Sequence, residues 1–379
     1  MSDDKERSIV PVRSRELTTR SADLARRGLG LLQVNKDRDA LEALYWSTGG
    51  PDWKNNTGWL QSANLEDWYG VTYEQGRVTQ LDLNHNQLAG PIPPELGRLG
   101  SLWWLRLDEN QLVGSIPPEL GRLTDLTLLW LSGNQLAGTI PPELWGLAKL
   151  EGLFLGGNQL VDPIPSEVSR LARLRILDLH GNRLNGPVPS ELGNLPEMGA
   201  LMLHDSQLTG SIPAALGNLA NLKFLYLQDN CLNGPIPPEL GSLAVLKVLH
   251  LHHNRLAGRI PPQLGALAKL EELSLAGNHL NGSIPLEIGS LIGLTFLGLD
   301  GNQLAGSIPS DLGRLGKLRS LWLHSNPLTG ALPRMLMNLK LEEFGFDDTH
   351  LSEPPDRAFQ QWLASIPYLK RTGVLCREG

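Results

Sequence analysis

The sequence predicts an α/β repeat solenoid, in which short coils stack on one another and pair their strands into a parallel sheet. The first observation is a near-copy within the chain, because LDLNHNQLAGPIPPELGRL (residues 81–99) returns as LHLHHNRLAGRIPPQLGAL (residues 249–267). The second is spacing: a series of asparagines from Asn86 to Asn326 is separated by multiples of 24 residues. The third is composition, since the 379-residue chain has 41 glycines and 27 prolines that recur at fixed positions of the repeat.

The asparagine series determines the number of repeats. It comprises Asn86, Asn110, Asn134, Asn158, Asn182, Asn230, Asn254, Asn278, Asn302 and Asn326. Ser206 occupies the one gap, so the spacing predicts eleven units of 24 residues over residues 78–340, without insertion or deletion. One coil cannot bury its apolar side alone, but eleven stacked coils form a continuous core.

Each position of the unit has a structural role, which the first copy illustrates. Leu81 and Leu83 alternate with polar residues as a short strand does, so stacked coils pair these strands into a parallel sheet. Asn86 follows at a turn, where its amide can donate to and accept from backbone groups that the bend leaves unpaired. Gly90 suits a second bend with positive φ, and Pro94 can start a short helical turn. We therefore assign the repeated residues to the fold and not to catalysis.

The segment before the repeats has a different pattern. Residues 35–77 are predicted to form an N-terminal cap, with a helix over residues 37–48 that begins at Asp37 or Asp39 as its N-cap. Residues 1–34 follow no repeat and mix charges of both signs, so we expect a mobile tail. A short amphipathic helix around Leu24 to Leu32 is the alternative.

The segment after the repeats, residues 341–379, is predicted to close the other end. It begins with LEEFGFDDTHL, a shorter and degenerate twelfth copy of the unit. In RAFQQWLASI, residues 357–366, the apolar side chains share one helical face. We therefore expect a helical cap over the last coil.

The recurring motif L-x-x-L-x-L-x-x-N-x-L-x-G-x-I-P-x-x-L-G-x-L resembles the plant-type leucine-rich repeat, the family of receptor-kinase ectodomains and polygalacturonase-inhibiting proteins. The resemblance implies a right-handed superhelical arc with the parallel sheet on the concave side and short 3-10 or irregular turns on the convex side. A second short sheet is implied at the I-P segments. The resemblance also implies binding of peptides, proteins or small ligands by the concave and lateral surfaces, without catalysis by the repeats.

The N-terminal cap departs from the family pattern, in which W-x-G-V lies between two cysteines. Trp68, Gly70 and Val71 are present here, but Glu66 and Tyr73 stand where the cysteines are expected. The chain has only two cysteines, which lie in unrelated contexts, and this usage is typical of a reducing compartment. We therefore expect a cytoplasmic protein, with a secreted or cell-surface protein as the alternative.

Charge and motif content narrow the possible functions. The net charge of −7 offers no basic surface, so we expect no nucleic-acid partner. No run of 18 apolar residues occurs, and we expect no membrane span and no kinase domain. Phosphate-binding loops, nucleophile elbows and paired-cysteine metal motifs are absent from the sequence, so we expect no enzyme, cofactor or metal. A monomeric interaction module, serving intracellular signalling or defence-type recognition, is the function that we predict.

Function must depend on the side chains that vary between coils. The positions that flank the two strand leucines face solvent on the concave sheet, and like positions of adjacent coils lie about 4.8 Å apart. These columns bring together many aromatic and apolar residues, which are enriched at the centres of interfaces. The residues predicted to bind a protein or peptide partner are Trp104, Arg106, Trp130, Phe154, Asp178, His180, Met202, His204, Phe224, Tyr226, His250, His252 and Trp322.

Several alternatives compete with this prediction. Neighbouring side chains could simply pack against one another along the sheet, so that nothing binds. His250 and His252 could be two metal ligands, with Asp229 or Asp205 nearby, and could support a metal-assisted enzyme. The histidines could instead form a polar recognition strip that becomes more positive below about pH 6.5.

Two further alternatives use other residues. Asp82, Asp108 and Glu109 with His85 could be an acid and base set at one end of the arc. The sequons that begin at Asn55 and Asn281 favour the secreted alternative, which includes an inhibitor of a foreign enzyme.

Overall fold

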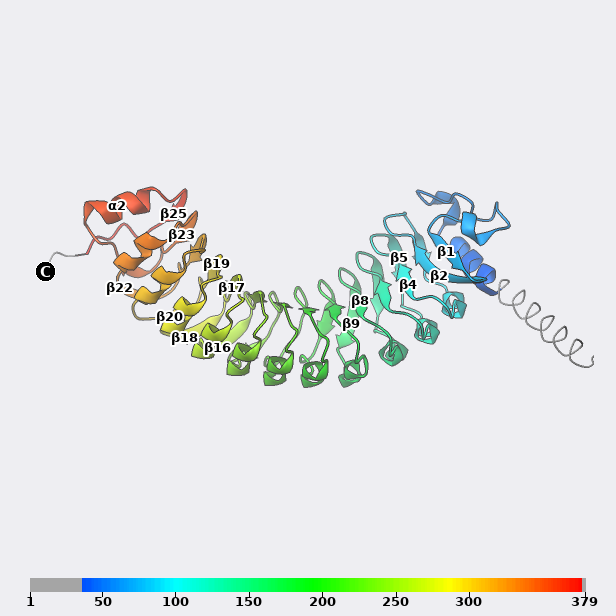
Figure 1. Cartoon of the computed structure of the whole chain (residues 1–379), viewed down its shortest axis with the longest axis horizontal. Helices are drawn as coiled ribbons and strands as arrows, with labels where there is room; N and C mark the ends of the chain where they lie inside the picture. The colour runs from blue at the N-terminus through cyan, green and yellow to red at the C-terminus, as the bar shows by residue number, and fades with distance from the viewer. Residues whose placement is uncertain (1–35, 377–379) are drawn as a thin grey trace, which may run out of the picture.

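The computed structural model describes residues 36–376, which form one arc of stacked coils (Figure 1). The expected tail over residues 1–34, with its alternative helix, lies outside the described residues. Along the arc, most coils repeat the order of sheet strand, edge strand and 3-10 turn. This arrangement confirms the predicted α/β repeat solenoid. Within the part of the chain that the structure describes, no helix is long and apolar enough to cross a membrane.

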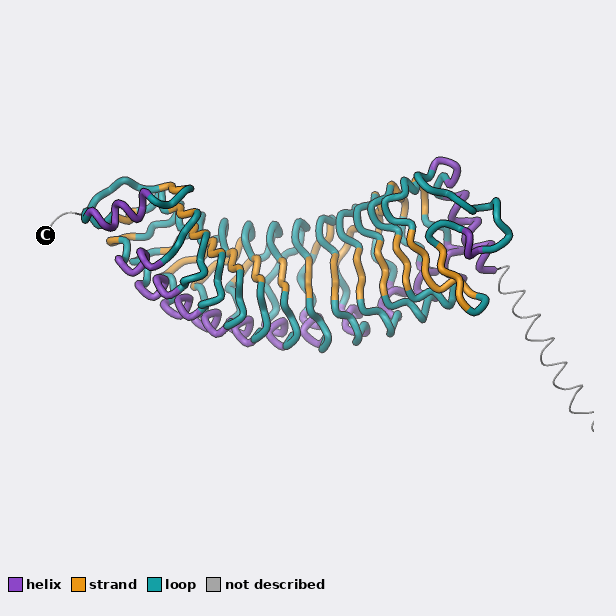
Figure 2. The backbone as a smooth tube through the Cα atoms, turned by 45° about the horizontal axis from the view of Figure 1, so that its top comes forward, coloured by secondary structure: helices purple, strands orange, loops and turns teal. Residues whose placement is uncertain are grey.

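A 14-stranded sheet follows the length of the arc (Figure 2). The first pair of strands is antiparallel and the later pairs are parallel. Equivalent residues of successive coils lie side by side, as Leu81 with Leu105 and Leu129 with Leu153, so each side-chain position forms a row along the sheet. In spatial order the strands are β1 (Val71–Glu74), β2 (Arg77–Asp82), β4 (Trp104–Arg106), β6 (Leu128–Trp130), β8 (Gly152–Phe154), β10 (Ile176–Asp178), β12 (Ala200–Met202), β13 (Phe224–Tyr226), β15 (Val248–His250), β17 (Glu272–Ser274), β19 (Phe296–Gly298), β21 (Ser320–Trp322), β23 (Glu343–Gly345) and β25 (Tyr368–Lys370).

Edge strands before the I-P segments form three smaller parallel sheets. The first contains β3 (Ala89–Pro91), β5 (Gln111–Gly114), β7 (Gln135–Gly138), β9 (Gln159–Pro163) and β11 (Arg183–Asn185). The second contains β14 (Asn233–Gly234), β16 (Arg255–Arg259), β18 (His279–Gly282) and β20 (Gln303–Leu304), and the third contains β22 (Thr329–Ala331) and β24 (His350–Ser352). The first two sheets are interrupted at the coil of Ser206, where isolated bridges at Thr209 and Ser211 replace an edge strand.

Short 3-10 helices line the outer edge of the arc (Figures 1 and 2). In the coils, each of them begins directly after a proline such as Pro93, whose ring restricts φ and whose backbone is extended. The 3-10 helices are η1 (Gly50–Asp52), η2 (Leu65–Asp67), η3 (Pro94–Arg98), η4 (Pro118–Arg122), η5 (Pro142–Gly146), η6 (Ser166–Arg170), η7 (Ser190–Asn194), η8 (Ala214–Asn218), η9 (Pro238–Ser242), η10 (Pro262–Ala266), η11 (Leu286–Ser290), η12 (Ser310–Arg314) and η13 (Arg334–Asn338).

The glycine of these turns permits close stacking of adjacent coils. A Cβ added to Gly97 would lie 2.3 Å from the backbone carbonyl oxygen of Glu119 in the next turn. Gly97 also lies inside η3 and does not end it. The residue is therefore required by the short distance between turns, because any side chain would push the coils apart.

The conserved spacing of asparagine corresponds to a buried ladder of hydrogen bonds. Asn158, for example, donates from Nδ2 to the carbonyl oxygens of Leu131, Leu155 and Gly156 at 3.0, 3.0 and 3.3 Å. Its Oδ1 accepts from the backbone N–H of Leu136 at 3.0 Å. Each asparagine side chain thus joins its own coil to the preceding one, as the turn position predicted.

The N-terminal cap differs from the prediction at its first helix. Residues 36–47 are helical, so the helix already includes Lys36 and neither Asp37 nor Asp39 is its N-cap. Asp37 is fully buried, and its Oδ2 accepts hydrogen bonds from Nε of Arg77 and the backbone N–H of Val78 at 3.1 and 3.0 Å. The Asp37 carboxylate therefore links the cap helix to β2. Without it, the buried backbone N–H of Val78 would need another acceptor.

At the other end, α2 (Arg357–Ala364) covers the last coil. Asp356 caps this helix by accepting a hydrogen bond from the N–H of Phe359, and the side chains of Phe359 and Leu363 are buried. The chain then returns to the main sheet, because β25 pairs in parallel with β23. The expected helical cap is present, and a final strand that the repeat pattern did not predict follows it.

Candidate functional site

Three aromatic rings on adjacent strands form a stacked group that we call the aromatic row: Trp104 on β4, Trp130 on β6 and Phe154 on β8. The ring centroids of Trp104 and Trp130 are 4.7 Å apart. Those of Trp130 and Phe154 are 4.8 Å apart with nearly parallel planes. Trp130 and Phe154 occupy the same position of adjacent coils, whereas Trp104 pairs with Leu128 and reaches Trp130 diagonally across the sheet.

Arg106 lies beside the aromatic row and is held by two carboxylates. Its Nε donates to Oδ1 of Asp108 at 2.9 Å, and its Nη1 lies 3.8 Å from Oδ2 of Asp82. The guanidinium also lies 5.9 Å from the ring centre of Trp130. The hydrogen bond to Asp108 raises the pKa of Arg106, so this cation is fixed in place on the sheet.

The apolar side chains of the concave columns are less exposed than we expected. The rings of the aromatic row are half-buried, and Val248 is only 6% exposed to solvent. The large hydrophobic side chains that are most exposed lie elsewhere, for example Trp46 in the N-terminal cap. Rings on adjacent coils cover one another, so the mutual packing that we considered as an alternative does occur. It leaves a surface of half-buried rings in place of a fully exposed patch.

Histidine rings form a second stacked group on the next coils, separate from the aromatic row. The rings of His180 and His204 stack with centroids 4.7 Å apart. Asp178, which we expected to face solvent, is only 7% exposed and hydrogen-bonds to Nδ1 of His180. This bond raises the pKa of His180. The pKa of His204 is lowered, mainly by burial and to a smaller extent by the charge of the neighbouring His180. The two stacked imidazoles therefore differ in their tendency to carry a proton.

The next strands extend the same surface. Phe224 and Tyr226 lie with parallel rings 6.4 Å apart, and Tyr226 also contacts His204 at 5.8 Å and His250 at 5.2 Å. Met202 lies half-buried on β12, between the coils of Asp178 and Tyr226. Predicted residues from β4 to β15 thus occupy consecutive strands of one sheet.

Trp322 stands apart from these residues but borders an open cavity of about 550 Å³ on the same sheet. Its ring lies 5.7 Å from that of His324 and 5.6 Å from that of Tyr368. At the other side of the cavity, Nε2 of His250 lies 3.0 Å from Oε2 of Glu272. The cavity is lined by His250, His252, His253, Glu272, Ser274, Ala276, Phe296, Asp300, Trp322 and His324.

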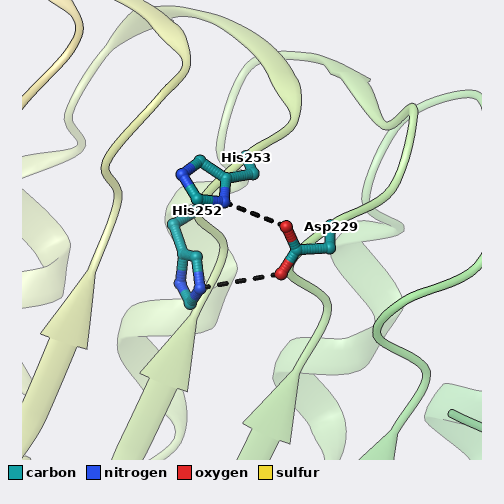
Figure 3. Close-up of side chains that lie close together, drawn as sticks. All are labelled: Asp229, His252 and His253. Atoms are coloured by element: carbon teal, nitrogen blue, oxygen red, sulfur yellow. Dashed lines mark hydrogen bonds and ion pairs between the residues drawn. The ribbon is translucent and has the colours of Figure 1, made fainter. Parts of the chain in front are cut away.

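The histidine cluster differs from the expected pair of His250 and His252. Asp229, His252 and His253 are the residues that converge, with one candidate ligand atom from each within 4.8 Å of the others (Figure 3). His250 instead pairs with Glu272. Burial lowers the pKa of His252 to about 4, so this imidazole is neutral at neutral pH. The pairing changes because His253 lies in the turn after the strand, where it approaches the preceding coil.

Comparison with known protein families agrees with the repeat and its geometry. The model of the Leucine Rich Repeat family matches nine segments that together cover more than half of the chain: residues 77–99, 101–123, 125–147, 173–195, 221–243, 245–267, 269–291, 293–315 and 317–339. The chain belongs to the leucine-rich repeat family. Leucine-rich repeat protein 1 of Arabidopsis thaliana is 37% identical to it over 91 residues, which are 24% of this chain and 42% of that protein.

Two solved structures show the same leucine-rich repeat architecture over most of this chain. One is the ectodomain of the receptor kinase GASSHO1/SCHENGEN3 from Arabidopsis thaliana in complex with CASPARIAN STRIP INTEGRITY FACTOR 2, with a TM-score of 0.78, 35% identity, and coverage of 88% of this chain and 43% of that one. The other is the Arabidopsis receptor kinase HAESA in complex with the peptide hormone IDA and the co-receptor SERK1, with a TM-score of 0.77, 34% identity, and coverage of 84% and 54%. This chain therefore spans about half the length of these relatives.

The suggested acid and base set at the first coils is engaged in a different interaction. Asp82 and Asp108 both lie against Arg106, so their carboxylates hold a cation.

Sequence reasoning missed several residues of the cavity and its rim. Phe296, Asp300 and His324 occupy the same solvent-facing columns as the predicted residues, so the leucine-rich repeat register itself could have identified them. His253 was also missed, whereas Asp229 was already considered as a neighbour of the histidine ligands. His253 occupies a turn position that is glycine in five of the eleven coils, but His85 and Glu109 occupy it too, so the position alone gave no specific signal.

Proposed function

We propose that this leucine-rich repeat protein is a non-catalytic recognition module that binds a peptide or a protein segment along its concave sheet. The observation that carries the proposal is two groups of stacked rings on one sheet, Trp104–Trp130–Phe154 and His180–His204–Tyr226–His250. His250, at the end of the second group, also lines the cavity beside Trp322. Stacked rings are rigid and partly dehydrated, so a partner gains contact area at a low cost in side-chain entropy.

The concave surface has two chemically distinct parts, and each part favours a different group on the partner. The aromatic row and Arg106 suit an apolar or aromatic segment followed by an acidic or polar group. The cavity near Trp322 carries Glu272 and Asp300 beside imidazoles, which suits a polar or basic group. An extended chain that crosses several coils would contact both parts. The solved complex of HAESA contains the peptide hormone IDA, which supports a peptide as the partner class.

The binding role of the predicted residues is tested by affinity capture with matched variants. The wild-type chain and Trp130→Ala are used to capture partners, and each captured partner is then titrated by calorimetry. We expect Trp130→Ala to weaken binding by about 2–4 kcal/mol, because truncation of a central aromatic anchor has this effect.

The control variants lie on the outer edge, where Glu95 and Arg98 form an ion pair across η3. Their replacement by alanine should change affinity by less than about 0.5 kcal/mol. Loss of binding in the outer-edge variants together with unchanged binding in Trp130→Ala would refute the concave site.

We also propose that the protein is secreted or displayed at the cell surface. The GASSHO1/SCHENGEN3 structure is a receptor ectodomain, and this similarity supports a secreted or cell-surface protein over the cytoplasmic protein that we first expected. Asn281 is exposed on β18 and begins a sequon, so it would be accessible to glycosylation. Treatment of the endogenous protein with an N-glycosidase should increase its mobility, and an unmodified Asn281 in protein from its native source would argue for the cytoplasm. We further propose a monomer, which sedimentation would verify.

A further inference from the structure

Three side chains from two adjacent coils converge at the rim of the concave cavity. Nδ1 of His253 lies 2.9 Å from Oδ1 of Asp229, and Nε2 of His252 lies 3.8 Å from Oδ2 of the same carboxylate. Figure 3 shows the two imidazoles approaching different oxygens of Asp229 from the next coil. The imidazole rings are 5.1 Å apart and nearly perpendicular. All three residues lie in the segments that follow the sheet strands β13 and β15.

The turn position that holds Asp229 and His253 has a left-handed backbone in all eleven coils, and it also holds His85, Glu109, Asp205 and Ser325. Asp229 and His253 have φ of 54° and 52°, in the left-handed region that side chains with a Cβ rarely adopt. The equivalent residues of the next two coils are glycines, Gly277 and Gly301, with φ of 59° and 62°. A Cβ on Gly277 would lie 2.5 Å from Cδ2 of His253, so glycine at this position leaves room for the imidazole ring.

We propose that Asp229, His252 and His253 form a site for a divalent transition metal of the zinc type. Two imidazole nitrogens and one carboxylate oxygen are a donor set that Zn²⁺ accepts, whereas Mg²⁺ and Ca²⁺ require mostly oxygen ligands. Bond lengths of about 2.0–2.1 Å separate the ligand atoms of a tetrahedral zinc site by about 3.3 Å. The three candidate ligand atoms, one from each residue, lie within 4.8 Å of one another, so side-chain rotations must bring them closer by up to about 1.5 Å. Three protein ligands would leave one coordination position open.

Other histidines of the concave surface do not have this combination. His180 pairs with Asp178, His250 with Glu272 and His324 with Asp300, each joining one imidazole to its nearest carboxylate. In the part of the chain that the structure describes, Asp229, His252 and His253 are the group of three candidate ligands that lie close together. The inference does not rest on the proposed peptide binding, because the ligands all belong to this chain.

The experiment measures binding of Zn²⁺ alone to the full chain after removal of bound metal by dialysis. Isothermal titration should give one site per chain, and bound Co²⁺ should give the visible absorption of a four-coordinate complex. His253→Gly should weaken Zn²⁺ binding about tenfold or more, since even the loss of residues that support a metal ligand weakens binding by 10–100-fold. The variant should fold at least as well as the wild type without metal, because glycine relieves the left-handed backbone.

A matched control is available within the same protein. His85 occupies the equivalent turn position of the first coil, with φ of 49°. His85→Gly therefore makes the same chemical and conformational change away from Asp229, and it should leave Zn²⁺ affinity unchanged. Absence of stoichiometric Zn²⁺ binding by the wild type, or equal loss of affinity in His85→Gly and His253→Gly, would overturn the proposal.

Discussion

Replacement of Asn158 by alanine tests the buried ladder on which the arc depends. Asn158 makes four side-chain hydrogen bonds and is 7% exposed. Two of its acceptors keep another bond after the change, because the carbonyl oxygen of Leu131 also accepts from Asn134 and that of Leu155 also accepts from Asn182. The backbone N–H of Leu136 loses its side-chain acceptor within a buried coil.

The expected loss of stability comes mainly from the backbone N–H of Leu136, because the carbonyl oxygens of Leu131 and Leu155 keep other hydrogen bonds. An unsatisfied buried N–H costs about 1–3 kcal/mol, and the weakened carbonyl interactions add to it, so we expect Asn158→Ala to lower the free energy of unfolding by about 2–3 kcal/mol. The effect is measured by urea unfolding, followed by far-ultraviolet circular dichroism.

The matched control is Asn185→Ala, because Asn185 is exposed at an edge strand. We expect this control to change the free energy of unfolding by less than about 0.5 kcal/mol. An Asn158→Ala variant as stable as the control would show that the ladder accompanies the fold without stabilising it.

The remaining predictions concern the gap in the ladder and the ring surface. Ser206→Asn should raise the free energy of unfolding by about 1 kcal/mol, because it restores an acceptor between two coils, and a lower urea midpoint would contradict this reasoning. Trp130→Ala should lower the free energy of unfolding by about 1–3 kcal/mol, because it removes two ring contacts of about 0.5–1.5 kcal/mol each; an unchanged thermal melt would indicate that the rings do not support one another. The pKa of His180 is raised by Asp178, so its contribution to stability is fully present below the unfolded pKa of about 6.5 and is lost as pH rises through the folded pKa. His180→Gln should therefore destabilise the protein more at pH 6 than at pH 8.5, and a larger loss at pH 8.5 would reverse the assigned direction.

The sequence determined the 24-residue coil and which side chains of successive coils occupy the same position on the sheet. A strict period of 24 residues aligns like positions of successive coils, so the sequence alone predicts the register of Leu81 with Leu105 and of Trp130 with Phe154. This was possible because each coil contacts mainly its neighbours, and local spacing therefore defines the long-range pairing. The boundaries between the caps and the repeats stay a prediction.

Tertiary structure decided the exposure of the rows and the partners of individual side chains. Stacking of rings across coils reduced the exposure of the aromatic row, and no spacing rule specifies ring rotamers. The pairing of His253 with Asp229 depends on a left-handed turn that directs the imidazole toward the preceding coil. Burial likewise changed Asp37 from an expected helix cap into an acceptor for β2. These outcomes depend on packing between side chains that the repeat places together but does not orient, so only the three-dimensional arrangement could decide them.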